Sequence, residues 1–245
     1  MSNDRRDPVG SHRWEACPLV VLCGSQEGGG ASAFAANTQD PDHQLAGRFH
    51  AATMVRNRPR TLGTWRVTTT SPTTADCVGQ LLGGHAHQDP TTGRAEVLTA
   101  ASTVGILLEG PDALHIGWQR SVNVTCDGAT QDDGQHCACP AGLAARRAAA
   151  KRGDGCRPRL EVRFVLADAP AAGVFGFASE DWSLVEQASM LREALDGSRM
   201  PARARLRLER TLHTLRSGRV LACTRPVITL ARADRKPEDP SATAR

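Results

Sequence analysis

Four cysteines in the second half of the chain could together bind a metal ion. They are Cys126, Cys137, Cys139 and Cys156, with ten, one and sixteen residues between them. In an extended Cys137-Ala138-Cys139 segment both thiols project to the same side, so both could face one ion. Four thiolates are the donor set of a closed, tetrahedral structural Zn²⁺ site. The spacing therefore predicts one structural zinc.

Three alternatives for these cysteines stay open at this point. The ring of His136 could replace one thiol, or the four residues could be reduced thiols in a loop. A disulfide is the third alternative. The apolar patch at residues 19–22 is too short for a secretory signal, so we expect the chain to stay in the cytoplasm. Because disulfides are rare there, that compartment favours thiols or metal.

The overall composition is that of a globular protein. Of the 245 residues, 40% are hydrophobic and 23% are charged, and no apolar run approaches the roughly 20 residues of a membrane span. The net charge of +4 and the pI near 8.8 are only mildly basic for a nucleic-acid-binding domain. We therefore expect no membrane contact and little or no specific binding to DNA by the chain alone.

Short strands dominate the sequence patterns that must position the cysteines. Alternating or β-branched segments predict them at residues 64–70, 95–99, 103–108, 114–118, 121–125, 160–166 and 173–177. A short helix is expected from Thr74 to Leu82, with Thr73 or Thr74 as its cap. The main helix is expected at 184–195, with a Ser183/Glu186 capping box and Gly197 as its stop. A basic helical stretch, 143–151, could fold back to deliver the last cysteine.

The clearest single pattern is the alternation of residues 202–209. It places Ala202, Ala204, Leu206 and Leu208 on one sheet face and Arg203, Arg205 and Arg207 on the other. Residues 220–230 form the expected hairpin partner, and Pro226 predicts that this partner lies at an edge or contains a bulge. The three arginines could contact an acidic protein surface or DNA phosphate, or they could simply form a solvated face.

These patterns predict an α+β fold, with a mostly antiparallel sheet, one main helix and a Cys-rich zinc-binding insertion. We expect an N-terminal extension at 1–46, partly mobile, and a flexible, charged tail at 233–245. The core would cover 47–232, with the zinc loop at 126–156.

The sequence carries no convincing catalytic signature. His85 and His87 resemble the start of a metallohydrolase ligand run, but Pro90 stands where a second Asp-His pair would be needed. We therefore interpret this segment as a polar turn, and no nucleophile-elbow sequence appears elsewhere. The remaining cysteines and three tryptophans are expected in the core: Cys17, Cys23, Cys77, Cys223, Trp65, Trp118 and Trp182.

An ordered set of segments resembles the recombination directionality factors of actinophages that use large serine integrases. The similar segments are residues 58–68, 82–84, 126–128, 137–140, 156–162, 173–179, 201–209 and 226–230. The resemblance covers about residues 47 to 230. The chain departs from the family at residues 119–125, where the family usually has a Gly-rich, basic segment that contains a cysteine.

The resemblance implies a non-enzymatic protein of the bacterial host cytoplasm. Such a factor binds a serine integrase on attachment-site DNA and switches it from integration to excision of the prophage. It activates recombination of the hybrid sites and inhibits the integrative reaction, with no small-molecule substrate. The resemblance also favours four-cysteine zinc ligation. The alternative function is a zinc-containing regulator that binds DNA directly.

Overall fold

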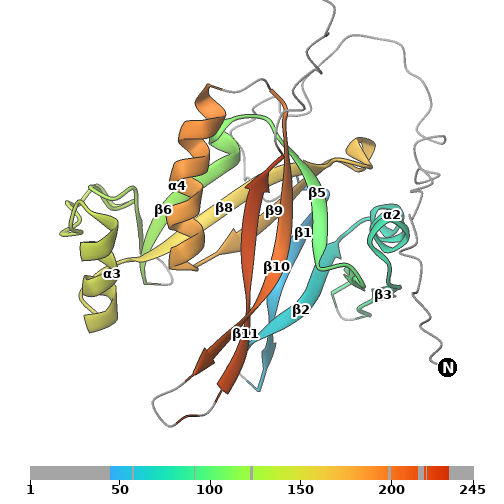
Figure 1. The fold of residues 1–245 in the computed structure, drawn as a ribbon, viewed down its shortest axis with the longest axis horizontal. Helices are drawn as coiled ribbons and strands as arrows, with labels where there is room; N and C mark the ends of the chain where they lie inside the picture. Colours follow the sequence, from blue (N-terminus) through green and yellow to red (C-terminus); the bar gives the residue numbers. More distant parts are fainter. Residues whose placement is uncertain are drawn as a thin grey trace, which may run out of the picture.

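The computed structural model describes residues 45–231, apart from 57, 91, 122–123, 198–199, 215–217 and 219. The expected N-terminal extension and C-terminal tail lie outside these residues, except for positions 45 and 46. The fold is α+β, as predicted, with a mostly antiparallel sheet (Figure 1). The strands are β1 (Gly47–Val55), β2 (Arg58–Thr69), β3 (Ala86–Gln88), β4 (Ala95–Leu98), β5 (Thr103–Leu108), β6 (Leu114–Ser121), β7 (Val124–Cys126), β8 (Arg157–Leu166), β9 (Val174–Ser179), β10 (Ala202–Thr214) and β11 (Val220–Leu230).

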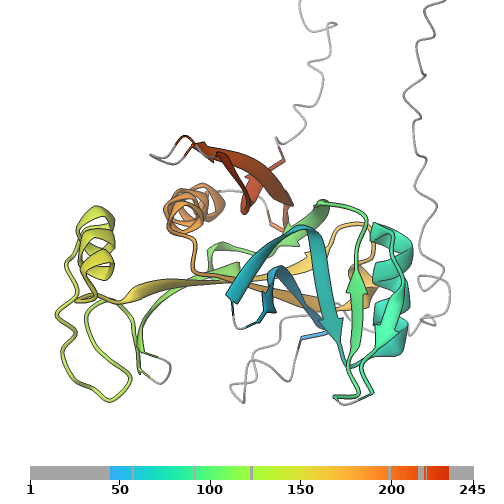
Figure 2. The same cartoon turned by 90° about the horizontal axis from the view of Figure 1, so that it is seen from below.

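The strands form one eleven-stranded sheet in the order β11-β10-β5-β8-β9-β1-β2-β4-β3, and β6 pairs with both β7 and β8. All pairings are antiparallel except that of β1 with β9. The sheet is strongly curved, so that β10 and β11 contact β1 and β2 across the core. Figure 2 shows this arrangement, with β10 and β11 on one side of β8 and with β1 and β2 on the other.

Aromatic side chains fill the concave side of the curved sheet. Phe49 of β1 makes edge-to-face contacts with Trp65, Phe164 and Phe175, at ring-centroid distances of 5.8, 5.3 and 5.6 Å. Trp65 and Phe177 meet in the same way at 5.4 Å. These rings are all buried, so the alternating strands β1, β2, β8 and β9 each present an apolar face to one core.

Three α-helices are present among the described residues: α2 (Pro72–Leu82), α3 (Leu143–Arg152) and α4 (Trp182–Asp196). The helix α4 is the longest, but the expectation of a single main helix is not confirmed. No helix in the described part of the chain is both long and apolar enough to cross a membrane.

The helix α4 packs on β6, β8 and β11 and buries one apolar face. The predicted stop at Gly197 is confirmed, but the predicted capping box is wrong. The cap is Asp181, whose Oδ1 accepts the backbone N–H groups of Ser183 and Leu184 at 2.8 and 3.0 Å. An ionised carboxylate at this position also interacts favourably with the positive end of the helix dipole.

The helix α2 covers β2 and β4 and buries Cys77, as expected for a core thiol. It begins two residues earlier than predicted, because Pro72 starts the helix instead of only ending the preceding strand. Proline is well suited to a first turn, where its missing N–H would have no partner. The cap is therefore Ser71, whose Oγ accepts the N–H of Thr74 at 3.2 Å.

Two of the predicted strands, 103–108 and 220–230, match β5 and β11. The strand β11 lies at the sheet edge, as Pro226 predicted. The strand predicted at 121–125 is wrong. Ser121 ends β6 and pairs with Val124 of β7, so the described residues of that segment belong to two antiparallel strands.

Candidate functional site

The four cysteines predicted as ligands come together at one end of the molecule. Cys126 ends β7, Cys137 and Cys139 lie between β7 and α3, and Cys156 lies between α3 and β8. Their four Sγ atoms all lie within 4.8 Å of one another. His136 is exposed and does not belong to this group.

The sulfur–sulfur distances fit a tetrahedral metal site better than a disulfide. The Sγ of Cys156 lies 3.7 Å from that of Cys126 and 3.6 Å from that of Cys137, and Cys137 and Cys139 lie 3.1 Å apart. Tetrahedral zinc with bonds of about 2.3 Å places its sulfurs about 3.8 Å apart. A disulfide requires about 2.05 Å, and all six cysteines in the described ranges are free thiols. The cluster is thus compatible with a structural metal.

Short turns return the chain from Cys126 to Cys137, in segments that contain the turn-forming sequences Asp127-Gly128 and Asp132-Asp133-Gly134. Asp127 Oδ1 accepts the backbone N–H groups of Ala129 and Thr130, both at 2.8 Å. These two bonds favour the ionised carboxylate and lower the pKa of Asp127. The N–H of Cys137 then donates to Ala129 O at 2.7 Å, which fixes the second ligand beside the first turn.

Arg146 of α3 fastens both sides of this loop. Its Nε donates to Pro140 O at 2.6 Å, and its Nη2 donates to Gly128 O at 2.8 Å. The guanidinium lies over the ring of Trp118, 4.3 Å from the centroid, and the side chain is buried. At Gly128, where φ is +110°, an added Cβ would meet the guanidinium nitrogens at 2.9 Å. One buried cation thereby positions the segments that carry three of the four thiols.

A tight exit from α3 delivers the fourth thiol. Gly153 ends the helix in the left-handed conformation, with φ +87°, and its N–H donates to Ala150 O. At Gly155 an added Cβ would approach Ala149 Cβ to 2.8 Å and Ala150 N to 2.9 Å. The absence of a side chain there allows Cys156 to return beneath the helix.

The protein surroundings alone shift the pKa values of Cys126, Cys137 and Cys156 in different directions. Burial raises the pKa of Cys126 to about 11, and burial also raises the pKa of Cys156. Burial opposes ionisation of Cys137 too, but hydrogen bonds from Cys139, Cys126 and Cys156 lower its pKa to about 7. A bound dication would hold all four sulfurs as thiolates, which is the chemistry that a zinc ion supplies at such a donor set.

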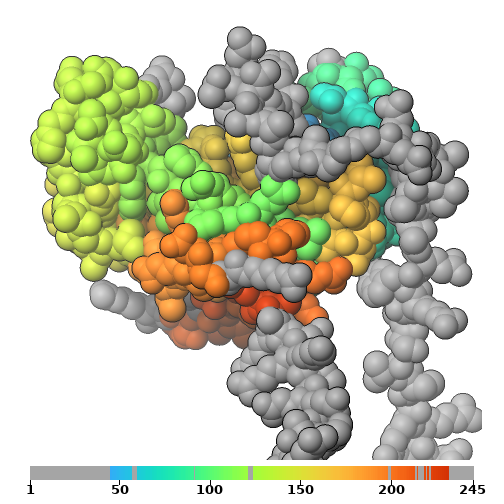
Figure 3. All heavy atoms as spheres, turned by 90° about the horizontal axis from the view of Figure 1, so that it is seen from above, coloured from blue at the N-terminus to red at the C-terminus, as the bar shows by residue number. Residues whose placement is uncertain are grey.

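The cysteine cluster, its loop and α3 form a lobe beyond the curved sheet, at the far ends of β6 and β8 (Figures 2 and 3). Paired strands connect this lobe to the body, because β6 and β8 pair from Leu114↔Val162 to Gln119↔Arg157. Trp118 also meets Trp182 of α4, with the ring centroids 5.8 Å apart.

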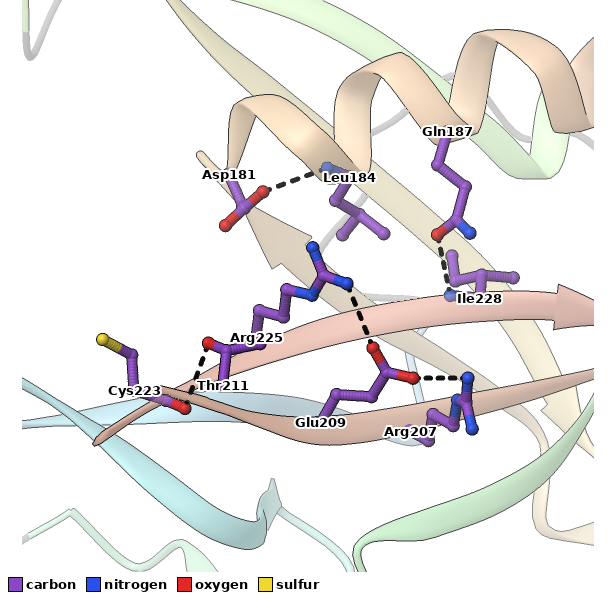
Figure 4. A network of polar contacts seen from close by, with 9 residues as sticks. All are labelled: Asp181, Leu184, Gln187, Arg207, Glu209, Thr211, Cys223, Arg225 and Ile228. Carbon is purple, nitrogen blue, oxygen red and sulfur yellow. Dashed lines mark hydrogen bonds and ion pairs between the residues drawn. The ribbon is translucent and has the colours of Figure 1, made fainter. Parts of the chain in front are cut away.

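The outer face of β10 carries Arg203, Arg205 and Arg207, all exposed as the alternation predicted. The structure distinguishes the three. Arg207 pairs with Glu209, and Glu209 also accepts a hydrogen bond from Arg225 Nη2 at 3.2 Å. Arg207 therefore belongs to a network of ion pairs within the chain (Figure 4). Arg203 and Arg205 instead line a cavity of about 520 Å³.

That cavity was not predicted, because its walls come from segments distant in sequence. They include Leu81 and Leu82 at the end of α2, Val104 of β5 and Asp168 after β8. A partner side chain entering it would meet apolar surface together with two guanidinium groups and one carboxylate.

The other sequence candidates have simpler roles. His85 and His87 are exposed, and neither joins a metal-ligand group within the described ranges. Trp65 and Trp118 are buried, as expected, and Trp182 is partly buried. The prediction of a core thiol is wrong for Cys223, which lies half-buried on the edge strand, where only one neighbour strand covers it. Cys17 and Cys23 lie outside the described residues.

The family described as Gp3-like, recombination directionality factor-like, matches residues 26–231. The chain belongs to this family. The match includes the four cysteines, α4 and the β10–β11 hairpin, and it indicates a regulatory accessory protein of recombination rather than an enzyme. No solved structure matches the chain.

Proposed function

We propose that this chain binds a phage serine integrase on attachment-site DNA and switches it from integration to excision. The observation that carries the proposal is the family match over residues 26–231. The integrase supplies the nucleophile and all strand exchange, in the cytoplasm of the bacterial host. The chain supplies only binding energy, so it needs no catalytic group of its own.

The switch requires a difference in affinity between two assemblies. A ligand shifts an equilibrium only by its differential affinity for the two states. The factor must therefore bind the synapse of the hybrid sites better than the synapse of the original pair. A difference of about 3 kcal/mol changes their ratio more than a hundredfold. A modest protein–protein interface can supply that difference.

In this proposal the four cysteines hold one structural Zn²⁺, and the metal keeps the lobe at residues 126–156 in one shape. The close approach of the four thiols and the fastening of their loop by Arg146 support this role. In this proposal the core includes the zinc lobe, and residues 1–46 and 233–245 are segments outside the core.

We propose that the integrase contacts the outer face of β10. Arg203 and Arg205 are the stronger candidates, because they line the cavity of about 520 Å³ beside apolar residues of α2 and β5. Arg207 contributes to the same face through its network with Glu209. A partner segment that combines an acidic and an apolar side chain would match this lining.

The proposal is tested with the cognate integrase and both pairs of sites in vitro. Adding the chain should activate recombination of the hybrid sites and suppress recombination of the original sites. Folded protein that changes neither reaction at saturation refutes the function. Arg203→Ser with Arg205→Ser should weaken both effects, whereas the matched pair Lys151→Ser with Arg152→Ser should leave them unchanged. Sequence-selective binding to attachment-site DNA without integrase would instead support a direct DNA-binding regulator.

A further inference from the structure

A second basic site lies on the outer face of the sheet, well separated from β10 in the strand order. Its side chains are Arg48 and His50 on β1 and Arg66 on β2, and His50 is opposite Arg66 in the register. Phe49, between the first two, is buried in the core. Because neighbouring residues of a strand face opposite sides, Arg48 and His50 both project from the outer face.

The charged side chains around this site are mostly arginines. Arg66 Nη1 pairs with Glu96 at 2.7 Å, and its Nε is buried without a hydrogen-bond partner among the described residues. Burial, followed by the charges of Arg66 and Arg48 and the smaller effect of Arg94, lowers the pKa of His50 to about 4. Neutral His50 therefore lies among three arginines, of which Arg66 is paired with Glu96.

A polar cavity of about 230 Å³ opens beside these side chains. Arg48 and Arg94 line it, together with Thr68 and Thr70. The Thr68 hydroxyl lies 2.9 Å from His50 Nε2, which links the cavity wall to the basic site. Since one water occupies about 30 Å³ of liquid, the space is sufficient for a phosphodiester group. Guanidinium and hydroxyl groups are the side-chain donors that most often contact phosphate oxygens.

We propose that this cavity binds a backbone phosphate of the attachment-site DNA when the factor is seated on the integrase. The inference rests on the proposed function and adds to it a second, DNA-directed contact. Recruitment by the integrase would bring the site to DNA that the factor alone binds only weakly, which agrees with a net charge of only +4.

The lining favours phosphate over an acidic protein segment. Apart from Leu45, the cavity wall consists of arginines, threonines and glycine. The cavity beside Arg203 contains two leucines, a valine and several alanines, which better suit protein side chains. The positive surface also continues along the outer face, because Arg163 of β8 and Arg48 both lie opposite Gly176 of β9.

The test compares Arg48→Gln with Arg94→Gln against a control of equal charge, Lys151→Gln with Arg152→Gln, on the exposed end of α3. Affinity is measured at a series of salt concentrations for integrase on attachment-site DNA and for integrase alone. For a random-sequence duplex the series covers the low-salt range. Each phosphate contact contributes about 0.9 to the slope of log affinity against log salt. Loss of the one phosphate contact should lower the slope on the integrase–DNA complex by about 0.9.

That slope difference means that the advantage of wild type over the variant shrinks about 3.5-fold between 50 and 200 mM salt. Affinity for integrase alone should not change. An unchanged slope on the complex, or an equal loss toward integrase alone, overturns the proposal, and the second outcome indicates an acidic protein surface. If the chain proves not to redirect the integrase, the duplex measurement still decides: a lower slope for the arginine variant alone supports the phosphate site, and equal slopes refute it.

Discussion

Replacing Arg146 with methionine should loosen the zinc lobe and weaken its affinity for metal. The variant loses hydrogen bonds from a charged donor to Pro140 O and Gly128 O, each contributing about 1.5–3 kcal/mol. It also loses the cation–π contact with Trp118, which contributes about 1–2 kcal/mol. Two effects offset these losses: water can reach the partly exposed Pro140 and Gly128, and the unpartnered Nη1 is removed from the interior. We expect a net destabilisation of about 3 kcal/mol.

This loss should appear in zinc binding, because Arg146 holds the loop that carries three of the four proposed ligands. A difference of about 3 kcal/mol corresponds to a dissociation constant raised roughly a hundredfold. The assay is equilibrium competition with a chromogenic chelator, alongside thermal unfolding. The matched control is Arg152→Met on the same helix, where the exposed arginine pairs with Asp154. An Arg146→Met affinity within threefold of wild type and of this control would show that Arg146 does not position the loop.

Three further predictions concern the metal, the pH dependence and a helix cap. Elemental analysis should find about one zinc per chain. The Cys139→Ser variant should lose most of this zinc and the Cys223→Ser variant none. Metal-free protein of full stability would exclude a structural site. Because His50 is held neutral, the unfolded chain binds more protons between pH 4 and 6.5. Stability to urea should therefore fall across this range as pH falls, and His50→Gln should flatten the change relative to wild type. Asp181→Ala should lower the unfolding free energy by about 1 kcal/mol in the same assay, and Asp181→Asn by much less.

The sequence was sufficient to predict those features in which the role of a residue depends on its immediate neighbours along the chain. The alternation at 202–209 predicted which side chains of β10 are buried, because one strand face meets the core. The Cys137-Ala138-Cys139 spacing predicted that both thiols could face one ion, and both belong to the cluster of four. In these two cases the deciding pattern lies within a few residues along the chain, whereas Cys126 and Cys156 are 30 residues apart in sequence.

Interactions that depend on distant segments were not predictable in this way. Arg146 and Arg147 are adjacent in an alanine- and arginine-rich helix, and nothing in the sequence distinguishes them. Arg146 is buried because Trp118 and two loop carbonyls lie beside it, and it holds the loop in place. Arg147 forms an ion pair with Glu186 at the surface. The helix cap was misplaced. Asp181 and the Ser183/Glu186 pair are both good caps in sequence, but the observed helix already includes Trp182 and Ser183, so Asp181 is the cap.

The connection between lobe and body bears on how such a factor can discriminate between two synapses. A flexible link would let the lobe adjust to either assembly, and the difference in affinity that drives the switch would then disappear. Here the link is the antiparallel pair of β6 and β8, and Trp118 contacts both Arg146 of the lobe and Trp182 of α4. The strand β8 begins directly after Cys156 of the cysteine cluster and reaches Phe164 in the core. The two contacts that we propose, on β10 and beside Arg48, lie on the same sheet as this link, so they are held at a fixed separation from each other and from the lobe. An assembly that presents its contacts at other separations can engage only some of these surfaces, and this geometric restriction is a physical basis for preferring one synapse over the other.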